Sequence, residues 1–177
     1  MKGLRAQRLK PKTQSPKPDG SAYATALRLL ARRELSEAQV RQRLLGRGLD
    51  AGEIETAIAR LKSERAIDDE RTAEAIARTD TTVKRRGRQR VTRQIERAGI
   101  ASRTASRAAA EAFENLDEEA LLEAALAKRL KGRATIDSDK DLQRLYRYLS
   151  GQGFDAERII ALLESKRRRR STVPPEA

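Results

Sequence analysis

Residues 36–64 read SEAQVRQRLLGRGLDAGEIETAIARLKSE, and the pattern of this stretch decides the fold. Two apolar residues four positions apart precede Gly48, and an apolar residue and a second pair with the same spacing follow it. This order is typical of a helix, a glycine that ends it, and a second helix. The pattern returns over residues 87–113 and 140–165, aligned on Gly99 and Gly153, so the glycines lie 51 (99−48) and 54 (153−99) residues apart. A repeat of this period predicts an array of helical modules.

We therefore predict an all-α fold: a tandem, elongated array of three three-helix modules with disordered basic tails. The first helix of each module is expected over Ala22–Arg33, from Asp68 to about Val83, and from Asp117 onward. Residues 1–21 hold three of the five prolines and almost nothing apolar to bury, which indicates disorder. The expected boundaries are a disordered basic arm at 1–21, modules at 22–67, 68–116 and 117–165, and a basic disordered tail at 166–177.

The composition favours several small cores and a polyanionic partner. Only 38% of the 177 residues are hydrophobic and 3% are aromatic, which is little material for one large core. Lys and Arg outnumber Asp and Glu by 39 to 26, a net charge of +13. Such a charge predicts attraction to nucleic acid, to a nucleoprotein or to an acidic protein face, and it does not choose among them.

The chain has no cysteine and no histidine. Disulfides, thiolate zinc sites, cysteine nucleophiles and histidine bases are therefore excluded. We expect a protein that is not an enzyme, with no catalytic residue, no metal site and no cofactor. No apolar run reaches the length of about 18 residues that a transmembrane helix needs, and no apolar stretch follows the basic start as in a secretory signal. The expected location is the cytoplasm.

A stripe of arginines is the main candidate binding feature. Arg86, Arg90, Arg93 and Arg97 have the spacing of one helix face, opposite to the apolar side chains of the same helix. Such a row suits successive phosphates or the carboxylates of a partner, and a solvated outer face is the alternative. A recognition helix of a helix-turn-helix is a further alternative, disfavoured by the threefold repetition of the module. With the cations beside the stripe, the candidate residues are Lys84, Arg85, Arg86, Arg88, Arg90, Arg93 and Arg97.

Other polar groups have simpler explanations than chemistry. Acidic residues at 68–70 and Glu74 suit the positive end of a helix dipole better than a metal site or an acid–base pair. Tyr146 and Tyr148 are expected to pack at the rim of a core, although Tyr148 has a direction from which it could stack on a base. The run from Lys166 to Arg170 is either a non-specific nucleic-acid element or the cationic end of a helix.

Three stretches of the chain resemble the RecX regulatory family. They are ALRLLARRELSEAQVRQRLLGRGL at residues 26–49, DDERTA at residues 68–73 and, more weakly, RYLSGQGFDAERIIALL at residues 147–163. The resemblance covers residues 22–165. The family usually has an aromatic residue where this chain has Thr72, and leucine where it has Ile95.

The resemblance implies a non-enzymatic regulator that lies in the helical groove of the RecA–single-stranded DNA filament. There it would modulate, and is expected to inhibit, ATP hydrolysis, strand exchange and co-protease activity. The implied partners are the RecA nucleoprotein filament and single-stranded or double-stranded DNA, with no membrane. We also expect a monomer, because small modules in tandem bury contacts only with their neighbours. Two alternatives stay open: a non-specific, architectural DNA-binding protein, and a helical scaffold for an acidic protein partner.

Overall fold

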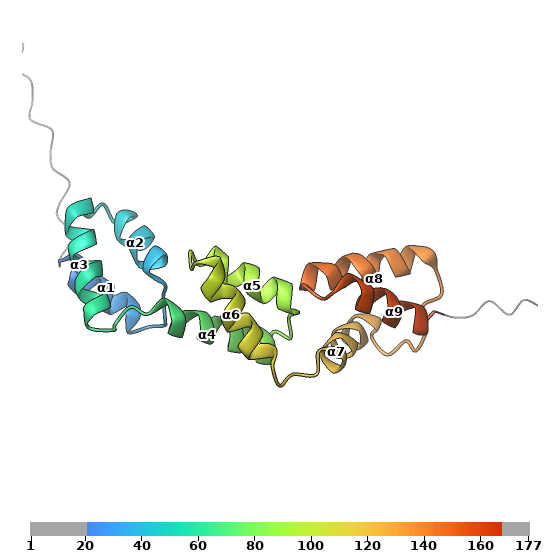
Figure 1. Ribbon diagram of the computed structural model, residues 1–177. Helices are drawn as coiled ribbons and strands as arrows, with labels where there is room; N and C mark the ends of the chain where they lie inside the picture. The colour runs from blue at the N-terminus through green and yellow to red at the C-terminus, as the bar shows by residue number, and fades with distance from the viewer. Residues whose placement is uncertain (1–20, 168–177) are drawn as a thin grey trace, which may run out of the picture.

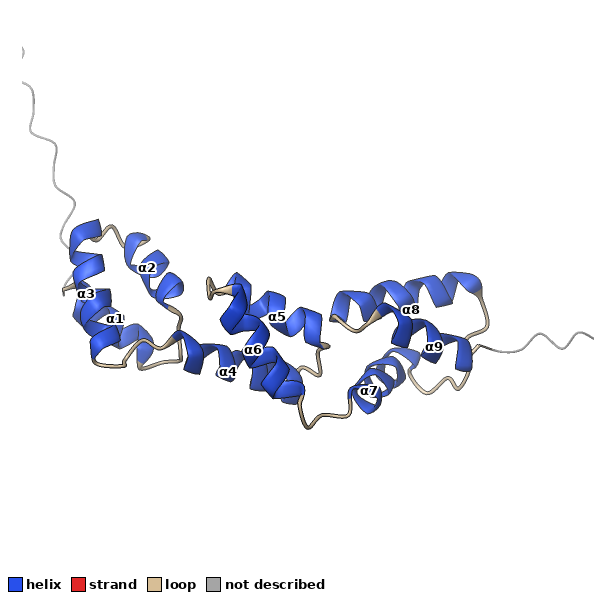
Figure 2. Ribbon diagram, in the orientation of Figure 1, coloured by secondary structure: helices blue, strands red, loops and turns tan. Residues whose placement is uncertain are grey.

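The computed structural model describes residues 21–167, and most of this part of the chain is helical. Figure 1 shows three helical modules that follow one another in a row, and Figure 2 shows loops as the only other structure between them. Within the described residues there are nine α-helices and one π-helix, with a single backbone bridge between Ile136 and Arg167. The prediction of an elongated, all-α array is confirmed. Nearly all of the predicted arm and tail lie outside the described residues, but Ser21, assigned to the arm, is the N-cap of the first helix.

Each module contains three α-helices. The first has α1 (Ala22–Leu30), α2 (Glu37–Leu45) and α3 (Ala51–Ser63). The second has α4 (Asp69–Arg78), the π-helix η1 (Thr79–Val83), α5 (Arg88–Arg97) and α6 (Ser102–Phe113). The third has α7 (Glu118–Leu130), α8 (Asp139–Gln152) and α9 (Ala156–Ser165).

Local sequence explains where many helices begin. The Ser36 hydroxyl accepts a hydrogen bond from the backbone amide of Gln39, and the Asp50 carboxylate accepts one from the amide of Glu53. Both are N-caps at the positions that the sequence predicts. Each cap satisfies an amide that the first turn of a helix leaves without a partner.

Each module has its own apolar core. The second core is the weakest, because six of its ten buried apolar residues are alanines, whose side chains bury little area. Large buried side chains at the centres of the three cores are Leu44, Ile54 and Leu61; Val91, Ile95 and Phe113; and Leu126, Leu145 and Leu149. Stability is therefore distributed along the row.

The helix expected from Asp68 to Val83 changes its hydrogen-bond pattern at Thr79, where η1 begins. Threonine hydroxyls compete with backbone amides there: Thr79 donates to the Ala75 carbonyl at 2.9 Å and Thr81 donates to the Ala77 carbonyl at 2.9 Å. This local competition bends and widens helices. The expected helix over Ala22–Arg33 also ends earlier, at Leu30.

At both joints between modules, a donor at the start of one module's second helix binds a carbonyl at the end of the next module's second helix. The Ser36 hydroxyl, at the start of α2, donates to the carbonyl of Ala98 at the end of α5. The Gly87 amide, at the start of α5, donates to the carbonyl of Gln152 at the end of α8, at 2.9 Å. As a result α2, α5 and α8 follow one another along one edge of the array (Figure 1).

Both joints require a glycine at the end of the incoming helix. Gly99 and Gly153 have φ of +81° and +88°, and a Cβ on either would overlap the preceding module, at Ala38 and Arg90 respectively. Gly48 has a similar φ of +73°, but a Cβ there would meet nothing within 4 Å. Gly48 is thus needed only for its left-handed backbone conformation. Gly99 and Gly153 also allow the backbones of two modules to approach each other closely.

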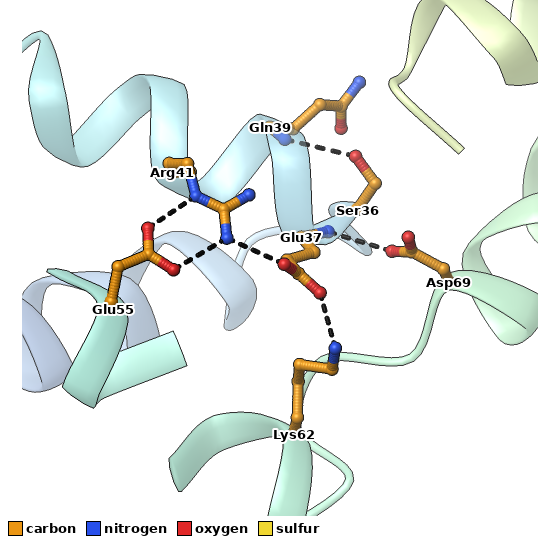
Figure 3. Close-up of polar contacts among 7 residues, drawn as sticks. All are labelled: Ser36, Glu37, Gln39, Arg41, Glu55, Lys62 and Asp69. Atoms are coloured by element: carbon orange, nitrogen blue, oxygen red, sulfur yellow. Dashed lines mark hydrogen bonds and ion pairs between the residues drawn. The ribbon is translucent and has the colours of Figure 1, made fainter. Parts of the chain in front are cut away.

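A polar network supports the first joint, as Figure 3 shows. The Glu37 amide donates to the Asp69 carboxylate of α4 at 2.9 Å. The Glu37 carboxylate pairs with Lys62 and with Arg41, both at 2.7 Å. Hydrogen bonds from Lys62, and then from Arg41, hold the pKa of Glu37 below its ordinary value.

Replacing Gly153 by alanine should destabilise the protein more than the same change at Gly48. Both variants place a side chain in the left-handed region, which costs about 1 kcal/mol. Gly153→Ala adds the overlap with the Arg90 backbone, for a total of about 3 kcal/mol. Urea unfolding followed by circular dichroism measures both. Equal losses would show that the second joint is not closely packed.

Replacing Glu37 by glutamine should reduce stability at neutral pH by up to about 1 kcal/mol, because the ion pairs are partly exposed. The folded-state pKa of Glu37 is lowered, so its contribution is present above the ordinary pKa and is lost as the pH falls through the folded value. The gap between variant and parent should therefore close in acid. Unfolding curves from neutral to acidic pH measure it, and a constant gap would contradict the ion-pair explanation.

Candidate nucleic-acid interface

The outer face of α5 carries two arginines that no carboxylate of residues 21–167 pairs with. Val91 and Ile95 lie on the buried face of the helix, since both are fully buried. Arg93 and Arg97 are exposed on the remaining surface. At about 1.5 Å of rise per residue they stand about 6 Å apart along the axis. Two guanidinium groups at that spacing can each bind an oxyanion of one partner.

Arg86 does not belong to this row, and the expectation of four arginines on one helix face is wrong for it. Arg86 lies before α5, and its side chain pairs with Asp80 at 2.7 Å. Lys84 pairs with the other oxygen of the same carboxylate, also at 2.7 Å. Asp80 is only 1% exposed, so these two cations balance a buried charge.

Arg88 and Arg90 connect the second and third modules. Arg88 pairs with Glu118 at 2.6 Å, and its guanidinium carbon lies 5.1 Å from the centre of the Phe113 ring. Arg90 donates to the carbonyl of Gly151 at 2.7 Å. Both side chains therefore have structural partners within the described residues.

Of the seven candidate cations, three have neither an ion pair nor a side-chain hydrogen bond in the described part of the chain: Arg85, Arg93 and Arg97. Arg85 is exposed and has a left-handed backbone, with φ of +51°. The structure thus separates the predicted group into free cations and cations that hold the fold.

The start of α5 is covered, which argues against the helix-turn-helix alternative. A recognition helix uses its first residues to contact base edges. Here the amides of Gly87 and Gln89 donate to the carbonyls of Gln152 and Gly153, at 2.9 and 3.2 Å. The third module therefore occupies the end of α5 that would enter a groove.

A second basic group lies in the first module and was missed by sequence reasoning. Arg43 donates to the Gln39 carbonyl at 3.1 Å, and Arg47 donates to the Arg43 carbonyl at 2.8 Å. Burial, and then the charges of Arg33 and Arg47, lower the pKa of Arg43. No carboxylate of residues 21–167 pairs with these three arginines. The spacing of four between Arg43 and Arg47 was the available signal.

The acidic residues at the start of α4 have structural roles. Asp68 accepts from the amides of Glu70 and Arg71, both at 3.0 Å. Asp69 binds the amide of Glu37, and Glu70 pairs with Arg107 at 2.6 Å. These contacts account for their positions without a metal.

The structure shows where Tyr146, Tyr148 and the first residues of the C-terminal basic run lie. Tyr146 and Tyr148 are half-buried against the third core, as expected for rim packing. Arg167 pairs with Asp139 at 2.6 Å. Residues 168–170 of the predicted basic run lie outside the described residues. Between residues 21 and 167 no helix has the length and apolar character to cross a membrane.

Replacing Asp80 by asparagine should destabilise the second module. The change leaves Lys84 and Arg86 without their counter-charge, and because Lys84 is about half exposed we expect a loss of about 2 kcal/mol. Glu114→Gln, at an exposed carboxylate that pairs with no cation of the described residues, is the matched control. Urea unfolding measures both variants, and an equal effect would show that the Asp80 pairs contribute little.

Comparison with known proteins identifies relatives of this chain. Residues 22–61 match the family model described as "RecX, first three-helix domain". The chain is 31% identical over 156 residues to the "Regulatory protein RecX" of Syntrophotalea carbinolica, covering 85% of this chain and 99% of that protein. It is 32% identical over 143 residues to that of Geobacillus kaustophilus, covering 80% of this chain but only 52% of that protein, so it spans about half of that relative.

The fold has a counterpart among solved structures. The crystal structure of RecX from Lactobacillus salivarius superposes with a TM-score of 0.64, covering 81% of this chain and 93% of that one. Sequence identity over this match is 19%, so the likeness shows the fold alone.

Proposed function

Because this chain belongs to the RecX family of regulatory proteins, we propose that it regulates RecA by binding in the groove of the RecA–single-stranded DNA filament. The protein acts without catalysis. It obstructs the movement of RecA subunits and of a second DNA strand, and so inhibits ATP hydrolysis, strand exchange and co-protease activity. It works as a monomer in the cytoplasm.

The observation that carries the proposal is the exposed basic surface on an elongated array. Arg93 and Arg97 on α5 are free of carboxylate partners in the described residues, and so are the three arginines of the first module. Cations whose charge no internal carboxylate balances are available to phosphates. An array of modules also spans a longer stretch of a filament than one compact core would.

The first alternative, a non-specific DNA-binding protein, predicts equal affinity for bare single-stranded DNA and for the filament. The second alternative, a scaffold for an acidic protein, predicts binding that is independent of nucleic acid. Both are tested by the same titrations. Their predictions differ in salt dependence as well, because phosphate contacts release counterions.

The direct test is the ATPase activity of RecA on single-stranded DNA with substoichiometric amounts of this protein. We expect a lowered rate. The double variant Arg93→Ala/Arg97→Ala should inhibit more weakly, and its binding should lose roughly one unit of log–log salt slope for each phosphate contact removed.

The control pair is Arg103 and Lys140, which are exposed and have no ion-pair partner among residues 21–167. Arg103→Ala/Lys140→Ala removes the same charge from other helices and should inhibit nearly as the parent does. An unchanged ATPase rate with the parent protein would overturn the proposed function. Equal weakening by both double variants would show that net charge, not the α5 face, is what matters.

A further inference from the structure

The joint between the second and third modules contains a cavity of about 250 Å³. Three segments line it: the turn after η1, with Lys84 and Arg85; α7, with Lys128; and α8, with Tyr148 and Gln152. These segments meet where α5 is followed by α8 in Figure 1. The cavity is therefore a product of the joint and belongs to no single module.

The first joint contains a cavity of about 340 Å³ at the equivalent place. The lining residues of the two joints are matched by their distance along the sequence from the same helix end. The first pair lies two residues before the N-cap of a second helix. The second pair lies eleven residues after the N-cap of the next module's first helix, and the third lies five residues before the glycine that ends that module's second helix. The equivalent pairs of lining residues are Glu34 and Arg85, Thr79 and Lys128, and Gln94 and Tyr148.

The two cavities differ in charge. At the first joint, Glu34 and Asp80 supply carboxylates to the wall beside its cations. At the second joint the lining includes Lys84, Arg85 and Lys128 and no carboxylate. Asp80 binds Lys84 at 2.7 Å, but no carboxylate in the described residues pairs with Arg85 or Lys128. The second cavity therefore has an uncompensated positive charge, which suits an anion.

The second cavity also has an aromatic wall, where the first has Gln94. Tyr148 is half-buried, and the guanidinium carbon of Arg129 lies 5.2 Å from its ring centre. Aromatic rings beside cations are a common platform for the bases of single-stranded nucleic acids. The volume is slightly below the usual range for whole small-molecule ligands, about 300–1,000 Å³, and suits part of one nucleotide.

We propose that the cavity at the second joint binds one nucleotide unit of single-stranded nucleic acid, with the phosphate between Arg85 and Lys128 and the base against Tyr148. The proposal rests on the proposed function in taking single-stranded DNA as the strand encountered. It adds a site for an individual nucleotide to the general attraction of a basic surface.

The chain itself supplies the test variants, because the first joint has Glu34, Thr79 and Gln94 at the equivalent positions. Arg85→Glu/Lys128→Thr gives the second cavity the charge of the first, and Tyr148→Gln removes the ring. The probe is a fluorescein-labelled oligodeoxythymidylate of about twelve nucleotides, bound to the full chain without RecA and followed by anisotropy. We expect binding about tenfold weaker for either variant.

A second readout reports on the ring. The chain has three tyrosines and no tryptophan, so its intrinsic emission comes from tyrosine. Unlabelled oligodeoxythymidylate should quench part of this emission in the parent protein, and Tyr148→Gln should lose that part. Circular dichroism confirms that the variants stay helical.

The control Arg103→Glu/Lys140→Thr makes the same charge change at exposed positions and should weaken binding by less than about twofold. Equal weakening by the control would overturn the proposal, because net charge would then explain binding. Displacement of the oligonucleotide by polyglutamate at equal charge concentration would also overturn it, since the site would then take carboxylates. RecA inhibition is measured separately, so a failure here leaves the proposed function standing, and the reverse holds too.

Discussion

The contact between the start of one helix and the end of another is the constraint on which the array depends. It occurs at both joints with different donors, a serine hydroxyl at Ser36 and a backbone amide at Gly87, but with a carbonyl just before the terminal glycine as acceptor each time. The glycines bring the two backbones close enough for it. Polar contacts, more than a shared apolar core, therefore set the orientation of neighbouring modules. A chain that is only 38% hydrophobic can form such joints.

Many of the cations that could have attracted a partner form contacts at or beside these joints instead. Arg88 and Arg90 hold the third module, and Lys84 and Arg86 balance the buried Asp80. A net charge of +13 therefore overstates the number of cations available for binding. Availability depends on whether an internal carboxylate balances a cation or a joint holds it, and this differs between adjacent residues such as Arg85 and Arg86.

Much of the fold could be predicted because its signals are local. Apolar spacing, capping residues such as Asp50 and the three repeated glycines all act within a few residues. The ion pair of Arg86 with Asp80 could not be predicted, since it depends on a helix that changes its hydrogen-bond pattern at Thr79 and buries Asp80. The joints join residues about sixty positions apart, such as Ser36 and Ala98, and periodicity carries no information on such pairs. Roles of individual arginines depended on these distant contacts.

The order of α2, α5 and α8 gives the molecule a direction. At each joint the amide end of one helix meets the carbonyl end of the next, so the helix dipoles point the same way along the edge and add. The row of these three helices ends at Gly48, after α2. A Cβ added at Gly48 would meet no other atom of the described residues within 4 Å. A nucleic-acid strand is also directional, from its 5′ to its 3′ end. The two antiparallel ways of laying this protein along a strand are therefore physically distinct, and they differ in free energy.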